Sequence, residues 1–139
     1  MGTSKANKKI FSHLYELYKE DKIEQLIDTC SHLVKSDNNS SELHKIMGAA
    51  YSKINELDKA AKHFEKAIEL KFNYAEAYYN LGIAFKELGK LEDSETSYKK
   101  AIELKPNYPD VQNSLSHNLL LKKNFIKAYE LYEWRWEVD

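Results

Sequence analysis

The sequence predicts an all-α protein built from stacked helical hairpins, and three observations point to this fold class. The hexapeptide KAIELK at Lys66–Lys71 recurs unchanged 34 residues later at Lys100–Lys105. Apolar residues around both copies follow the spacing of amphipathic helices. Short connections rich in Asn, Gly, Asp and Lys separate these helical segments, as at 54–59 and 88–93. A fixed period of this length indicates a solenoid in which each hairpin packs on its neighbours.

We expect eight helices, at residues 5–19, 22–35, 41–54, 57–70, 75–88, 91–104, 109–122 and 125–138. Gly89 can take the left-handed conformation that ends a helix, and Asn55 is the next-best residue for that task. Ser40 or Ser41 is placed to cap the third helix. Pro109 suits a first helical turn, where no amide hydrogen is needed.

Two glycines, Gly48 and Gly82, fall in the middle of predicted helices, where glycine costs about 1 kcal/mol relative to alanine. We expect this cost to be offset because the glycines let the paired helix approach closely at Ala67 or Ala101.

The spacing of large, small and aromatic residues in the block 75–108 resembles the tetratricopeptide repeat. The residues that carry the resemblance are Tyr78, Leu81, Gly82, Phe85, Ser94, Tyr98, Ala101 and Pro106. The block 41–74 matches through His44, Met47, Gly48, Tyr51, Ala60, Phe64 and Ala67, with Phe72 at the proline position.

The resemblance implies a right-handed superhelical solenoid of about four repeats. Residues 1–6 are then a disordered start, 7–40 a degenerate first repeat, 41–74 the second repeat and 75–108 the third. Residues 109–139 form a partial fourth repeat with an aromatic C-terminal helix. The outer repeats depart from the pattern, because Leu14 and Ser116 replace the small glycine, and Leu33 and Arg135 replace the small alanine.

The composition argues against several classes of partner. The net charge is −1 with 31% charged residues, so nucleic acid and anionic membranes, which favour basic proteins, are not expected partners. No apolar stretch is long enough to cross a membrane, and the N-terminus lacks the apolar core of a signal peptide. One cysteine cannot form an internal disulfide, which fits a reducing compartment. We predict a cytoplasmic protein.

No group of residues has the spacing of a catalytic or metal site. Cys30 falls at the repeat position of Phe64 and Tyr98, so we interpret it as a packing residue. The five histidines are scattered without metal-ligand spacing, and no glycine-rich phosphate loop follows a strand. We predict that the chain is not an enzyme and has no catalytic residues, no metal and no cofactor.

The resemblance implies that the first helix of each repeat lines a concave groove, which predicts a non-catalytic scaffold for protein–protein interaction. Its partner would be a protein, bound as a peptide or a helix. The predicted groove residues are Phe11, Tyr15, Lys45, Ile46, Tyr79, Asn80, Ile83, Lys86, Asn113 and His117. The repeated hexapeptide lies on the second helices, so we assign it to architecture and not to specificity.

One groove type of this family is disfavoured. Relatives that hold the C-terminal carboxylate of chaperones use lysine, arginine and asparagine side chains from three successive repeats. At those positions only Lys45 and Asn80 fit, and Asp110 would repel a carboxylate.

The C-terminus is the second candidate site, because Tyr129, Tyr132, Trp134 and Trp136 concentrate aromatic side chains on a helix that no further repeat covers. Three interpretations stay open. The tryptophans fold back on the last hairpin, they form a homodimer, or the chain is a fragment whose next domain is missing. The motif Tyr-Glu-Trp-Arg-Trp resembles the end of repeat arrays in bacterial proteins that continue into a glycosyltransferase- or sulfotransferase-like domain. The alternative function is therefore an N-terminal recruiting or oligomerising segment of a larger bacterial transferase.

Overall fold

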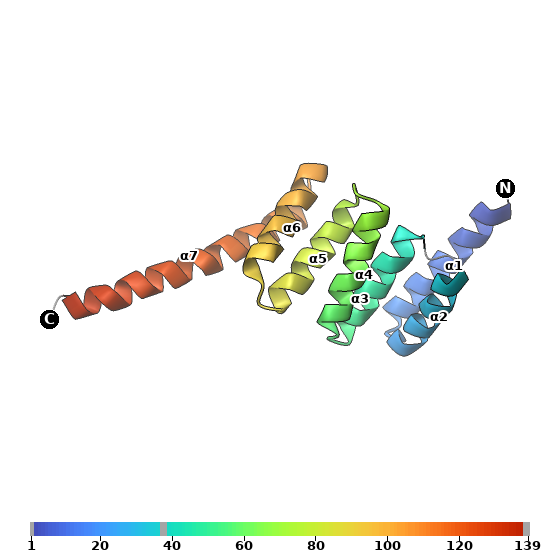
Figure 1. Ribbon diagram of the computed structural model, residues 1–139, viewed down its shortest axis with the longest axis horizontal. Helices are drawn as coiled ribbons and strands as arrows, with labels where there is room; N and C mark the ends of the chain where they lie inside the picture. The colour runs from blue at the N-terminus through green and yellow to red at the C-terminus, as the bar shows by residue number, and fades with distance from the viewer. Residues whose placement is uncertain (1, 37–38, 138–139) are drawn as a thin grey trace.

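The computed structural model describes residues 2–36 and 39–137, and it describes side chains for residues 5–36, 39–124 and 126. This part of the chain is all-α and contains seven helices (Figure 1). They are α1 (Gly2–Lys19), α2 (Ile23–Ser36), α3 (Ser41–Lys53), α4 (Leu57–Leu70), α5 (Ala75–Glu87), α6 (Leu91–Leu104) and α7 (Pro109–Glu137). The predicted fold class is confirmed, and the first six helices begin and end within three residues of the expected positions.

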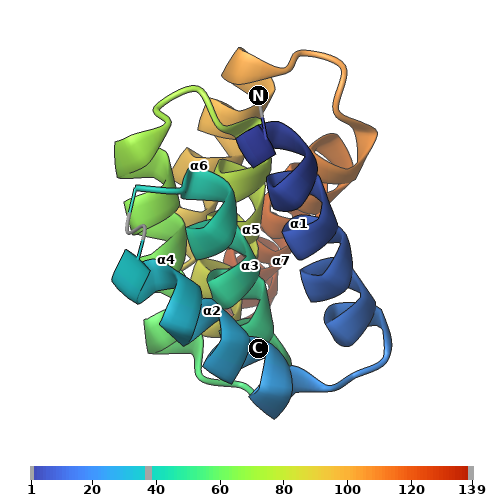
Figure 2. The same ribbon diagram turned by 90° about the vertical axis from the view of Figure 1, so that its right-hand side faces the viewer.

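The helices form a row of antiparallel hairpins. Each helix packs against the next one along the chain, and α3 also contacts α5. Figure 1 shows the pairs α1–α2, α3–α4 and α5–α6 side by side, and Figure 2 shows the same stack from its N-terminal end. The buried residues form three successive clusters along this row, centred on Leu14, Phe64 and Tyr98. The core is therefore a strip between two layers of helices, as a solenoid requires.

The turns of the first three hairpins share one backbone conformation. Asp21, Asn55 and Gly89 have positive φ angles of 60°, 61° and 80°, and successive members lie 34 residues apart. The amide of the next residue then bonds back to the helix, from Lys22 N to Leu17 O and from Lys90 N to Phe85 O, at 2.9 and 2.8 Å. This is the pairing of a helix that ends in a left-handed residue. The expectation for Gly89 and Asn55 is confirmed, and Asp21 extends it to the first hairpin.

Ser40, and not Ser41, caps α3. Its side chain accepts a hydrogen bond from the backbone amide of Leu43 at 3.2 Å, and its own φ and ψ are extended. Pro109 begins α7, as expected.

The fourth hairpin differs from the prediction, because α7 runs unbroken where two helices were expected at 109–122 and 125–138. Lys123 stands 34 residues after Gly89, at the position where the other hairpins turn. A lysine enters the left-handed region far less readily than Gly, Asn or Asp, so the helix continues. In Figure 1, α7 extends away from the stacked hairpins.

The N-terminus also differs, because α1 begins at Gly2, so most of the expected disordered start at residues 1–6 is helical. Lys5, Ala6, Lys8 and Lys9 are good helix formers, which allows the helix to extend beyond its packed part.

The atoms nearest to an added Cβ at the mid-helix glycines belong to aromatic rings, whereas the sequence suggested alanines as the residues that approach there. A Cβ added at Gly48 would lie 2.5 Å from Cε1 of Phe64, and one at Gly82 would lie 2.4 Å from Cε1 of Tyr98. The first repeat reverses the sizes, with Leu14 at the glycine position and Cys30 at the aromatic position, and both are fully buried. Each hairpin therefore pairs one large and one small residue at this contact.

Candidate functional site

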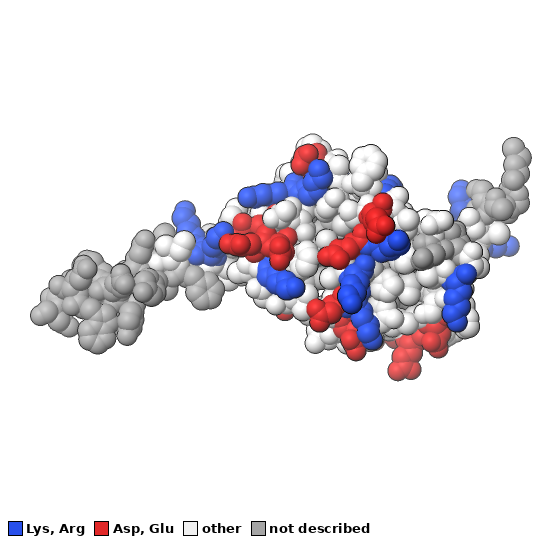
Figure 3. Space-filling model, in the orientation of Figure 1, with Lys and Arg blue, Asp and Glu red and all other residues white. Residues whose placement is uncertain are grey.

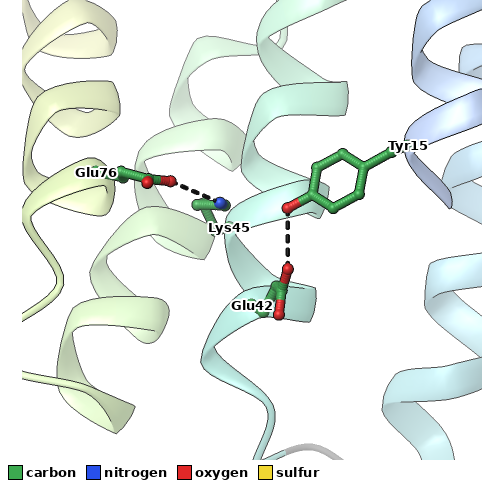
Figure 4. Close-up of polar contacts among 4 residues, drawn as sticks. All are labelled: Tyr15, Glu42, Lys45 and Glu76. Atoms are coloured by element: carbon green, nitrogen blue, oxygen red, sulfur yellow. Dashed lines mark hydrogen bonds and ion pairs between the residues drawn. The ribbon is translucent and has the colours of Figure 1, made fainter. Parts of the chain in front are cut away.

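One face of the first helices carries a group of charged and aromatic side chains centred on Lys45 of α3 (Figure 4). Lys45 Nζ lies 2.9 Å from Glu76 Oε2 of α5. The hydroxyl of Tyr15 on α1 donates a hydrogen bond to Glu42 Oε1 at 3.0 Å. Three successive repeats thus meet at this point, which we call the Lys45 cluster (Tyr15, Glu42, Lys45, Tyr74 and Glu76).

Lys45 is held as a cation among aromatic rings. Its Nζ lies 5.9 Å from the ring centroid of Tyr15 and 5.3 Å from that of Tyr74, within the range of a cation–π contact. Its side chain is only 13% exposed. Burial lowers the pKa of Lys45, but hydrogen bonding with Tyr74 and Glu76 outweighs this and leaves the pKa raised. The hydrogen bond from Lys45 in turn lowers the pKa of Glu76.

Tyrosines continue this surface into the third repeat. The Tyr79 ring lies 5.4 Å from Tyr108 in an edge-to-face arrangement and 5.9 Å from the buried Tyr98. Such pairs hold each other in one orientation and present rigid apolar area to a ligand. Burial raises the pKa of Tyr108, so the hydroxyl stays protonated and available as a donor.

The end of the repeated hexapeptide contributes to this surface. Lys71 Nζ lies 4.5 Å from the Tyr74 ring centroid, and Lys105 Nζ lies 4.4 Å from the Tyr108 ring centroid, one repeat further on. Sequence reasoning missed Tyr74 and Tyr108, which belong to the connections and not to the first helices. The repeated pair Asn73-Tyr74 and Asn107-Tyr108 was the signal that could have found them.

The predicted groove residues other than Ile46 fall into three groups. Tyr15, Asn113 and His117 are exposed, and Lys45, Tyr79, Asn80, Ile83 and Lys86 are partly buried at the surface. Phe11 lines a separate small pocket with Ile10, Leu33 and Leu43 at the end of the first hairpin.

The prediction that Ile46 lines the groove is wrong. Its side chain is 3% exposed and belongs to the core cluster around Leu14, so it is not available to a partner. It lies one residue after Lys45 in α3 and on the face that packs against its neighbours, which the repeat register alone did not resolve. Tyr129, Tyr132, Trp134 and Trp136 lie in the last part of α7, outside the side chains that the structure describes.

Two observations concern metal binding and thiol chemistry in the described side chains. They include no group of three or more His, Cys, Asp or Glu residues placed to hold a metal ion. Cys30 is fully buried in the core, and burial raises the pKa of its thiol to about 12, which confirms its packing role.

Among residues 2–36 and 39–137, no helix combines the length and hydropathy needed to cross a membrane.

Charges of both signs share the visible surface. Figure 3 shows acidic and basic side chains intermixed over the stacked hairpins, without a broad patch of one sign. This matches the net charge of −1.

Comparisons with known proteins agree with this architecture. A tetratricopeptide repeat model matches residues 75–108, and a TPR repeat model matches residues 48–89. No curated protein sequence matches the chain.

Solved structures with the same fold include three at 25–26% identity. The second TPR domain of human RPAP3 is 26% identical, with a TM-score of 0.74, over 78% of this chain and 91% of that chain. MamA is 26% identical, with a TM-score of 0.78, over 92% of this chain and 79% of that chain. A mutant O-GlcNAc transferase of Thermobaculum terrenum is 25% identical, with a TM-score of 0.76, over 81% of this chain but only 22% of that chain.

The two matched repeats, the stacked hairpins and the repeated turn at Asp21, Asn55 and Gly89 agree with one another. This chain therefore contains tetratricopeptide repeats, which the two models match between residues 48 and 108.

Proposed function

We propose that the chain is a non-catalytic scaffold that binds a peptide or helix of a partner protein on the face formed by α1, α3 and α5. The observation that carries the proposal is the Lys45 cluster, continued by Tyr79 and Tyr108. It offers rigid aromatic area together with groups that donate and accept hydrogen bonds, the combination found at protein interfaces. The human RPAP3 domain, similar in fold, was solved in complex with the HSP70 peptide SGPTIEEVD, which supports peptide binding as the type of function.

The partner of this chain differs in charge from such an acidic peptide. Lys45, the cation best placed to meet a carboxylate, is already paired with Glu76. Asp110 is exposed at the position that follows Glu76 by one repeat, and it would repel an acidic C-terminus. A ligand with aromatic or aliphatic side chains and uncharged polar groups fits this surface better.

The test of the binding face uses the double variant Tyr79→Glu/Ile83→Glu. We expect the affinity for the partner to fall by roughly tenfold or more, because two new charges would replace apolar contact area. Partner capture by the intact protein would be measured beside a thermal melt that verifies folding. The matched control Thr96→Glu/Lys99→Glu adds two glutamates at exposed positions of α6. Capture that is equal in both variants would place the binding site elsewhere.

We also propose that α7 mediates a homodimer. The described part of α7 leaves Leu119, Leu120 and Ile126 exposed, at 44%, 57% and 54%. Large apolar side chains on an uncovered helix favour association with another surface.

The homodimer is tested by sedimentation of the double variant Trp134→Ser/Trp136→Ser. We expect the wild-type chain to sediment as a dimer and the variant as a monomer, with unchanged helical content by circular dichroism. A wild-type chain that stays monomeric at high concentration would contradict the proposal.

A third proposal is that the chain is the recruiting or oligomerising segment of a larger bacterial transferase. The likeness to 22% of the O-GlcNAc transferase chain supports it, since this fold occurs there as a small part of a longer protein that is named a transferase. The observation that separates this proposal from a free-standing scaffold is whether the encoding reading frame continues past Asp139 into a catalytic domain. The chain by itself is expected to show no turnover.

A further inference from the structure

Two histidines meet inside the second hairpin. His44 of α3 and His63 of α4 place their Nδ1 atoms 3.1 Å apart. The His63 ring lies nearly parallel to the rings of both His44 and Tyr51, with interplanar angles of 24° and 8° and centroid distances of 5.4 and 5.3 Å. His44 is only 4% exposed. The contact is therefore part of the packing between the two helices.

This contact accommodates one proton between the two nitrogens. In a hydrogen bond at 3.1 Å, one Nδ1 carries the hydrogen and the other accepts it through its lone pair. If both rings became cationic, both nitrogens would carry hydrogens and would face each other. Two like charges would then be held at short range away from water, which disfavours the doubly protonated pair.

Folding lowers the pKa of His63. Burial lowers the pKa of His63 below its ordinary value of 6.5, and the charge of His44 lowers it further. The unfolded chain therefore binds a proton at a higher pH than the folded chain does. The stability that comes from the neutral pair is complete above about pH 6.5, and it decreases as the pH falls from there through the lowered folded-state pKa.

Several charged groups on the elements around the pair take part in contacts of their own. Lys59 Nζ lies 5.6 Å from the Tyr51 ring centroid and pairs with Glu56 at 3.9 Å. Lys45, next to His44 in sequence, pairs with Glu76 of α5. On the neighbouring helices α2 and α5, four further charged residues are exposed, and they are Glu24, Asp28, Lys35 and Glu87. Lys86 of α5 is partly exposed.

We infer that the His44–His63 contact is a pH-sensitive latch, which holds the α3–α4 hairpin closed at neutral pH and loosens it under acidic conditions. His44 directly precedes Lys45 in α3, so opening the hairpin also disturbs the Lys45 cluster. The third repeat has no such latch, because Tyr78 and Ser97 occupy the two corresponding positions and line one pocket together.

The third repeat supplies the matched control, the variant His44→Tyr/His63→Ser. Thermal melts followed by circular dichroism between pH 5 and 8 would compare it with the wild-type chain. We expect the wild-type Tm to fall by about 5 °C more than that of the variant as the pH decreases. The other three histidines, His13, His32 and His117, are exposed and present in both proteins.

A second measurement does not depend on how well the variant folds. Titration of the wild-type histidine ring protons by NMR should give a pKa below 6.5 for one histidine of the pair, and the two should titrate together. Equal Tm changes in wild type and a well-folded variant, or independent titration of both rings at the ordinary value, would overturn the inference.

Discussion

Replacing Gly48 with leucine is expected to lower the free energy of unfolding by about 3 kcal/mol. The space next to Gly48 is filled by the Phe64 ring, since an added Cβ would already lie 2.5 Å from it. Phe64 is itself 1% exposed, so its ring is enclosed by neighbouring residues. Urea unfolding followed by circular dichroism would measure the loss.

The first repeat provides the matched rescue. It carries Leu14 and Cys30 where the second repeat carries Gly48 and Phe64. The double variant Gly48→Leu/Phe64→Cys should therefore recover at least about 1 kcal/mol of the loss, because the two sites contact each other and their effects are not additive. If the double variant is as unstable as the sum of the single variants, the exchange of large and small residues is not what governs this contact.

Replacing Tyr98 with alanine is expected to lower the free energy of unfolding by about 4 kcal/mol, because it empties the space that Gly82 leaves for the ring. Tyr98 is 1% exposed and lies in the core cluster shared by α5, α6 and α7. Differential scanning calorimetry would measure a correspondingly lower Tm.

The control for this variant is Tyr98→Phe, which reproduces the residue at the same position of the second repeat. This variant keeps the ring and loses the hydroxyl, so we expect the free energy of unfolding to fall by only about 1 kcal/mol. A similar cost for both variants would show that the hydroxyl, and not the ring, stabilises the third hairpin.

Much of the fold could be predicted because local signals recur with one period. Left-handed residues at Asn55 and Gly89, a proline at 109 and a cap at Ser40 mark helix ends that follow from backbone chemistry alone. The unbroken α7 was missed because it depends on the absence of such a signal. Lys123 occupies the repeat position at which Asn55 and Gly89 have a left-handed backbone. Ser116 has a Cβ at the repeat position where Gly82 has none.

The candidate site could be predicted only in part. The repeat register placed Tyr15, Lys45 and Tyr79 near the proposed binding face, since they lie on the first helices. It also placed Ile46 there, although the side chain is buried. Tyr74 and Tyr108 were missed, because residues of the connections reach this face only when the hairpins stack.

The sequence by itself determined the repeat, its length and the helix ends, because these depend on the backbone preferences of a few residues and on the periodicity of apolar side chains. Only the tertiary structure decided which partners those residues meet. It placed Phe64 and Tyr98 against the two glycines, Lys45 against Glu76, and His44 against His63. These contacts join residues 16 to 31 positions apart, and their geometry is set by how the helices pack against one another.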